Sequence, residues 1–92
     1  MFKNPMGVAI DQVGNIYIAD ADNHCIRKIT TNGIVTTFAG NGIGGYADGL
    51  GSNAKFSSPY GLVFDNSGNL FVSEFYGNRI RIESKFYIMT VF

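Results

Sequence analysis

The chain alternates short apolar runs with clusters of glycine, asparagine and aspartate. Valine, isoleucine, tyrosine and phenylalanine dominate the runs, and turn residues bound them closely, which favours strands over helices. A run that ends in Thr30 and one that begins at Ile34, for example, are separated only by Thr-Asn-Gly. The pattern predicts strands at residues 7–11, 15–20, 25–30 and 34–39, with later ones at 79–84 and 88–92.

Two four-residue segments have the composition of hairpin turns. Asp11-Gln-Val-Gly14 separates the first two runs, and Asp65-Asn-Ser-Gly68 stands in the corresponding place later in the chain. An aspartate side chain starts such a turn by accepting backbone N–H groups, and glycine takes the positive φ that the turn requires. The last turn of the chain differs, because Lys85-Phe86-Tyr87 stands where the first half has Thr31-Asn32-Gly33.

The chain matches itself at an offset of 54 positions. The residues Pro5, Gly7 and Asp11 recur 54 positions later, as do a Gly-Asn pair and an Ile-Arg pair. No gap is needed as far as Phe38, which matches Phe92. A match at turn residues and apolar positions together indicates an internal repeat. The predicted organisation is a first repeat at 2–38, a glycine-rich spacer at 39–55 and a second repeat at 56–92.

Four short antiparallel strands that recur at a fixed period are typical of a β-propeller blade. The predicted fold class is therefore all-β, with two four-stranded antiparallel blades that form part of a propeller. Blades are covered by neighbours on both faces, which explains strands that are almost continuously apolar. A small β-sandwich is the competing fold, and the ungapped repeat makes it the weaker one.

Composition narrows the classes of function. The chain has 92 residues, a net charge of zero and 46% hydrophobic residues, so it is not a disordered tail. A neutral chain argues against a nucleic-acid module, which carries a basic stripe. No apolar segment is long enough to cross a membrane and no signal peptide is expected at the start. The lone Cys25 is expected to be a buried thiol.

At this point the residues resemble the NHL repeat. The pattern Pro-x-Gly, Asp-x-x-Gly-Asn and Asn-x-x-Ile-Arg stands here as Pro5 to Gly7, Asp11 to Asn15 and Asn23 to Arg27. The second repeat carries it from Pro59, and departs at Glu74 and Gly77, where the family favours aspartate and asparagine. The resemblance covers essentially the whole chain.

The resemblance implies a β-propeller of about six blades. It does not imply one function, because NHL propellers occur in tripartite-motif ubiquitin ligases, RNA-binding regulators, cell-surface proteins and related lyases.

Binding residues are expected at one end of the blades. In an up-and-down blade the loop between strands two and three shares its end with the spacer, and loops on a rigid scaffold carry function. Phe75 and Tyr76 have no apolar role in the repeat pattern, so they either contact a ligand or pack on a neighbouring blade. The candidate interaction residues at this end are Asp22, Asn23, His24, Tyr46, Asp48, Phe75 and Tyr76.

No catalytic, cofactor-binding or metal-binding site is predicted. The segment from Asp20 to Asn23 lacks the glycine and the distal glutamate of a calcium loop. His24 is the single histidine, and apart from the adjacent Cys25 it has no companion for a zinc site. Arg27 and Arg81 recur on the third strand of each repeat, so we expect them to bond carbonyls or acids structurally.

The favoured function is a non-enzymatic interaction module that presents loops to a protein partner, as in a tripartite-motif-type ligase. The alternatives are part of a propeller enzyme, such as a lyase or a lactonase-like protein, or an RNA-binding propeller. Two blades leave two open faces, which either further blades of the same protein or other copies of the chain would cover.

Overall fold

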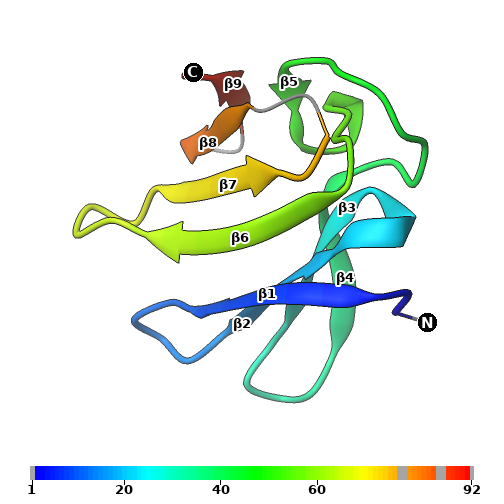
Figure 1. Ribbon diagram of the computed structural model, residues 1–92. Coiled ribbons are helices and arrows are strands. Elements are labelled where there is room, and N and C mark those ends of the chain that lie inside the picture. Colours follow the sequence, from blue (N-terminus) through cyan, green and yellow to red (C-terminus); the bar gives the residue numbers. More distant parts are fainter. Residues whose placement is uncertain (1, 77–78, 85–86, 92) are drawn as a thin grey trace.

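The computed structural model describes residues 2–76, 79–84 and 87–91 of the chain. Two antiparallel sheets make up this part, in the strand orders β1-β2-β3-β4 and β5-β9-β8-β7-β6 (Figure 1). The predicted all-β class and the blade-like meanders are thereby confirmed. The strands of the first sheet are β1 (Pro5–Ile10), β2 (Ile16–Asp20), β3 (Cys25–Ile29) and β4 (Val35–Gly40). Those of the second are β5 (Gly49–Leu50), β6 (Pro59–Phe64), β7 (Leu70–Glu74), β8 (Ile80–Ser84) and β9 (Tyr87–Thr90).

The predicted hairpin turns form by the expected mechanism. Asp11 Oδ1 accepts hydrogen bonds from three backbone N–H groups that follow it, at 2.9–3.0 Å, and Gly14 has a φ of 103°. Asp65 repeats the arrangement in the second sheet, where Gly68 has a φ of 87°. Each turn is therefore built from local hydrogen bonds that the short sequence motif supplies.

The second sheet has a strand that the repeat pattern did not predict. Within the spacer, β5 pairs with β9, and Gly49 lies opposite Ile88. The spacer also contains a 3-10 turn, η2 (Gly51–Asn53), which lies against β4 of the first sheet. The spacer therefore covers an outer edge that would otherwise present unpaired backbone groups.

The last strand is paired one residue away from the sequence match. Arg27 lies opposite Thr37 in the first sheet, whereas Arg81 lies opposite Thr90 in the second. Ile34 and Ile88 match in sequence, yet Ile34 is 58% exposed and Ile88 only 1%. A shift of one residue moves a side chain to the other face of a strand, which explains the difference. Phe92 and the residues Lys85 and Phe86, also considered above, lie outside the described part.

The core lies between the two sheets. Within it, Tyr17 makes edge-to-face contacts with Phe38 and Phe64, and in both pairs the ring centroids are 5.0 Å apart. Such contacts add to the stabilisation that burial of the rings provides. The buried members of the cluster are Tyr17, Ala19, Ile26, Ala39, Ala54, Phe56, Leu70, Val72 and Ile88.

The outward faces of both sheets are apolar as well. Val8 of β1 and Val63 of β6 are exposed large hydrophobic residues on these faces. Ile18 pairs with Val8 and points away from the second sheet, yet it matches Val72, which is buried between the sheets. The open face of the first blade thus has the composition of a face that a neighbouring blade covers.

Candidate functional site

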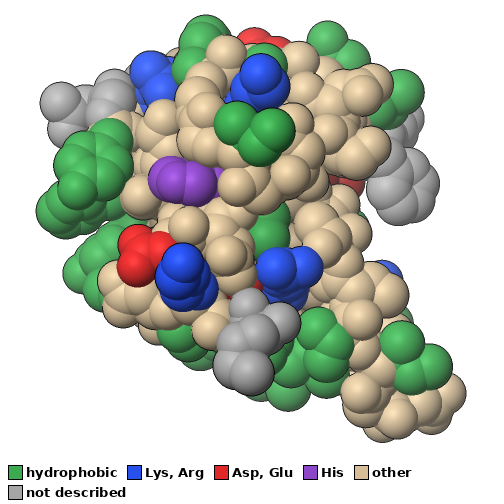
Figure 2. Space-filling model, turned by 90° about the vertical axis from the view of Figure 1, so that its right-hand side faces the viewer, with side chains coloured by type: hydrophobic (Ala, Val, Ile, Leu, Met, Phe, Trp, Pro, Cys, Tyr) green, Lys and Arg blue, Asp and Glu red, His purple; other side chains and the backbone are tan. Residues whose placement is uncertain are grey.

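One end of the two blades, here called the rim, carries the β2–β3 connection, the start of the β7–β8 connection and part of the spacer. The β2–β3 connection is a 3-10 turn, η1 (Ala21–Asn23), which ends at His24 in a left-handed conformation with a φ of 53°. Figure 2 shows the histidine at the surface, where the two halves of the molecule meet. The structure places the seven predicted interaction residues in this region, but in different settings: two in a polar network, three beside a pocket, and Asn23 and His24 in separate contacts of their own.

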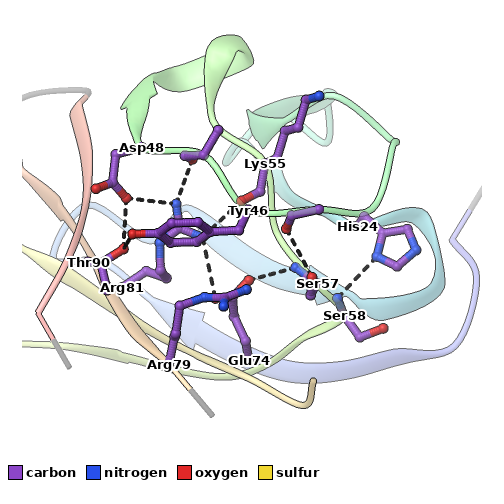
Figure 3. A network of polar contacts seen from close by, with 12 residues as sticks. His24, Tyr46, Asp48, Lys55, Ser57, Ser58, Glu74, Arg79, Arg81 and Thr90 are labelled. Atoms are coloured by element: carbon purple, nitrogen blue, oxygen red, sulfur yellow. Dashed lines mark hydrogen bonds and ion pairs between the residues drawn. The ribbon is translucent and has the colours of Figure 1, made fainter. Parts of the chain in front are cut away.

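The first setting is a polar network around Arg81 (Figure 3). Arg81 has no exposed surface, and its guanidinium donates to the carbonyl oxygens of Lys55 and Ala47 at 2.8 and 2.7 Å. It also bonds Asp48 Oδ1 at 3.1 Å and lies 3.4 Å from Glu74 Oε1. The predicted structural role of this arginine is confirmed, because its contacts tie the spacer to the second blade.

Tyr46 and Asp48, both predicted as interaction residues, belong to this network. The guanidinium carbon of Arg79 lies 4.1 Å from the centre of the Tyr46 ring, a cation–π contact. Thr90 bonds the Tyr46 hydroxyl and Asp48 Oδ1, both at 2.8 Å. These contacts give both side chains a structural task within the chain.

Asn23 also has a structural task. Its side-chain amide donates to Asp20 Oδ2 at 2.8 Å, next to the ion pair between Arg27 Nε and the same oxygen at 3.0 Å. Burial acts to raise the pKa of Asp20, but these bonds and the backbone N–H of Lys3 outweigh it and hold the pKa below its usual value. The Asp20 carboxylate is therefore held in its ionised form, and its hydrogen bonds stabilise the β2–β3 connection.

His24 connects the two blades. Its Nδ1 accepts a hydrogen bond from the backbone N–H of Ser58 at 3.1 Å. A Cβ added at Gly44 of the spacer would lie 3.1 Å from the imidazole ring, so the ring is closely covered. The neighbouring Cys25 is buried, as predicted, and burial raises the pKa of its thiol. His24 is thus a link between blades whose acceptor nitrogen is in use.

The second setting is a pocket of about 150 Å³, here called the rim pocket, which brings Asp22, Phe75 and Tyr76 together. Phe75 lies between two rings, with its centroid 5.9 Å from that of Tyr60 and 4.9 Å from that of Tyr76. The three rings are 45–62% exposed. The full lining comprises Asn4, Met6, Ala21, Asp22, Ser58, Tyr60, Phe75 and Tyr76.

Sequence reasoning missed Tyr60 and Met6. Both lie in the first strand of a blade, and the repeat pattern singled out neither as a candidate. The Pro-x-Gly motif contained the only signal, because its variable position is methionine in one repeat and tyrosine in the other. Contact between that position and the β7–β8 connection depends on the packing of the blades and cannot be seen in a local pattern.

A larger hollow of about 400 Å³ lies at the opposite end, between the two hairpin turns. Its acids are already engaged: Asp11 accepts the Tyr17 hydroxyl at 3.0 Å in addition to its turn N–H groups. Burial, followed by this bond to Asp11, raises the pKa of Tyr17 to about 12. The Asp11 carboxylate therefore serves the turn and the Tyr17 hydroxyl.

Neither a metal-binding cluster nor a membrane-spanning helix is present among the described residues. They contain no group of three or more histidine, cysteine, aspartate or glutamate side chains placed to hold a metal ion. Across the same part of the chain, no helix has the length and apolar character needed to span a membrane.

Comparison with known sequences identifies the repeat. The family model of the NHL repeat matches residues 2–29. The chain is 37% identical over 82 residues to Protein SUPPRESSOR OF QUENCHING 1, chloroplastic, of Arabidopsis thaliana, covering 88% of this chain and 8% of that protein. It is 47% identical over 70 residues to NHL repeat-containing protein 2 of Gallus gallus, covering 72% of this chain and 10% of that protein. The chain thus spans a tenth or less of the length of these relatives.

Solved structures support the fold. A protein of unknown function from Bacteroides thetaiotaomicron superimposes with a TM-score of 0.77 at 30% identity, over 84% of this chain and 20% of its own. Virginiamycin B lyase from Staphylococcus aureus superimposes with a TM-score of 0.69 at 16% identity, over 94% of this chain and 26% of its own. The solved structures show the β-propeller fold, and the sequence matches together with the repeat motifs show that the chain belongs to the NHL-repeat family.

Proposed function

We propose that the protein is a non-enzymatic interaction module whose rim pocket binds a protein partner. The observation that carries the proposal is the exposed cluster of Tyr60, Phe75 and Tyr76 beside that pocket. Aromatic residues are enriched in the cores of protein interfaces, where a few of them supply most of the binding energy. The cluster has the composition and the exposure that such a surface requires.

The backbone beneath the cluster is held in place, which favours binding. The N–H of Phe75 donates to the carbonyl oxygen of Ser58 at 2.9 Å, and the N–H of Ser58 donates to His24. Tyr60 stands in β6, within a paired strand. A surface that is ordered before it meets its partner loses less conformational entropy on binding.

The enzyme alternative has less support from the residues. Virginiamycin B lyase shares the fold with this chain, and at 16% identity the likeness extends no further than the fold. The single histidine, His24, already accepts a backbone N–H group through Nδ1. Because Nδ1 is engaged in this bond, the ring has no second unprotonated nitrogen to serve as a general base or a metal ligand.

Selection from a random peptide library displayed on phage tests the proposal. The protein is the bait, and each enriched peptide is then measured against a Phe75→Ser/Tyr76→Ser double variant. We expect affinity to fall about tenfold or more, because the variant removes two anchor rings. A Val13→Ser variant is the control, since Val13 is an exposed apolar residue in a turn at the opposite end. Enriched peptides that bind the wild type and the double variant equally would contradict the proposal.

A further inference from the structure

We infer that the rim pocket takes the guanidinium group of an arginine side chain from the partner. This inference rests on the proposed function, since it names the chemistry that the same pocket recognises. It follows from a comparison of the pocket with the places where the chain holds its own arginines.

Of the chain's three arginines, Arg27 is paired with Asp20, whereas Arg79 and Arg81 each lie where an aromatic ring and a carboxylate come together. Arg79 lies over the Tyr46 ring at 4.1 Å, and its Nε bonds Glu74 Oε1 at 3.0 Å. Arg81 lies 5.0 Å from the centre of the Phe56 ring and is paired with Asp48. A ring face attracts a cation through its quadrupole, while the carboxylate supplies charge and hydrogen-bond acceptors.

The rim pocket has the same components without a cation of its own. Three aromatic rings lie beside it and Asp22 lines it, whereas no lysine or arginine is among its lining residues. Within the described residues, the Asp22 carboxylate forms no hydrogen bond or ion pair. The other rim acids differ, since Asp20 is paired with Arg27 and Glu74 with Arg79.

A guanidinium suits this pocket better than the alternatives. It is planar, it stacks on aromatic faces and it is more weakly hydrated than an ammonium group. The pocket of about 150 Å³ is small, which favours the end of one side chain over a larger ligand. A phosphate group would meet an uncompensated carboxylate, which disfavours nucleic acid at this position.

The test is a titration followed by NMR. The isotope-labelled protein is titrated with acetyl-Gly-Gly-Arg-Gly-Gly-amide and with the same peptide containing citrulline, which has nearly the shape of arginine but no charge. We expect saturable shifts of the backbone amides of Asp22, Ser58 and Phe75 with the arginine peptide. The citrulline peptide should bind about fivefold more weakly.

An Asp22→Asn variant shows whether the bound group is positively or negatively charged, because it removes the negative charge of the pocket. We expect it to weaken the arginine peptide roughly threefold to fivefold, as for a partly exposed ion pair. An Asp65→Asn variant is the matched control, because it removes the same charge from a turn at the opposite end, where asparagine is also a good turn residue. It should leave the affinity unchanged.

The outcomes separate this inference from the proposed function. If library peptides need Phe75 and Tyr76 but bind equally well to Asp22→Asn and contain no arginine, the interaction module stands and the guanidinium pocket is wrong. If a uridine oligonucleotide binds at the same amides and binds more tightly to Asp22→Asn, the pocket serves RNA and the inference is overturned. If neither peptides nor the oligonucleotide depend on the aromatic rings, both proposals fail.

Discussion

Gly7 of β1 lies so close to Tyr60 of β6 that a Cβ added at Gly7 would stand 2.3 Å from the Tyr60 carbonyl oxygen. The two strands are the first of each blade and lie side by side where the sheets meet (Figure 1). The glycine of the Pro-x-Gly motif therefore has a tertiary role, since only a residue without a side chain allows this approach.

A Gly7→Ala substitution is expected to destabilise the protein by about 2 kcal/mol or more, because the new methyl group meets backbone that cannot rotate away. Gly61→Ala is the matched control from the second repeat, where the added Cβ would meet the Ser73 hydroxyl at 2.8 Å. That side chain can turn aside, so a smaller loss is expected. Urea unfolding measures both variants, and equal losses would show that the contact between blades does not set the cost.

Replacement of Arg81 by methionine is expected to lower the free energy of unfolding by about 2–4 kcal/mol, because two hydrogen bonds from a fully buried guanidinium to the spacer are lost and the buried Glu74 carboxylate loses a cation. Arg27→Met removes the matching residue of the first blade, whose side chain is 24% exposed, and should cost about 1 kcal/mol. Denaturant titration compares the two. A larger loss for Arg27→Met would contradict the role assigned to Arg81.

Acid should weaken the first hairpin turn. Burial acts to raise the pKa of Asp11, but the hydrogen bonds from Asn15, Tyr17 and Val13 outweigh it and lower the pKa from 3.8 to about 2. A carboxyl group with a lowered folded-state pKa stabilises the fold above pH 3.8, and this contribution disappears as the pH falls towards 2.

The Asp11→Asn variant should therefore be less stable than the wild type at pH 6, by on the order of 1 kcal/mol, and nearly equal to it at pH 2. Thermal unfolding at a series of pH values measures the difference. A gap between the two proteins that is constant over this range would refute the assignment.

The open face of the first blade gives a test for further blades. Val72→Ala should cost about 2–3 kcal/mol, since Val72 is only 1% exposed between the sheets. Its repeat partner Ile18 is half-buried on the open face, so Ile18→Ala should cost clearly less in the isolated 92-residue chain. In a longer protein with a blade packed on that face, the two losses should become similar. Chemical unfolding of both forms measures this, and a small loss for Ile18→Ala in both would mean that no blade covers the face.

The features predicted well from the sequence are those with local causes. The turns at Asp11 and Asp65 need only a side chain that bonds the next few N–H groups and a glycine that takes positive φ. The strands follow from apolar runs between such turns, and the repeat follows from their recurrence. The recurrence of Arg27 and Arg81 likewise indicated a structural role before any contact was visible.

The features that were missed depend on contacts between distant parts of the chain. Ile34 and Ile88 match without a gap, yet the register of β9 differs by one residue from that of β4, a difference that local sequence preferences do not determine. The pairing of β5 with β9 could not be predicted from glycine-rich sequence, since that strand exists only because an edge is available to it.

The predicted interaction residues show the same division. The sequence by itself determined that this end of the blades carries them, because an up-and-down meander sends alternate connections to opposite ends. Only the tertiary structure decided that Tyr46 and Asp48 serve Arg81, that Phe75 and Tyr76 stand beside a pocket with Asp22, and that Tyr60 joins them. The physical reason is that turn and strand preferences act over a few residues, whereas a pocket forms where separate blades meet, and its composition is fixed by their packing.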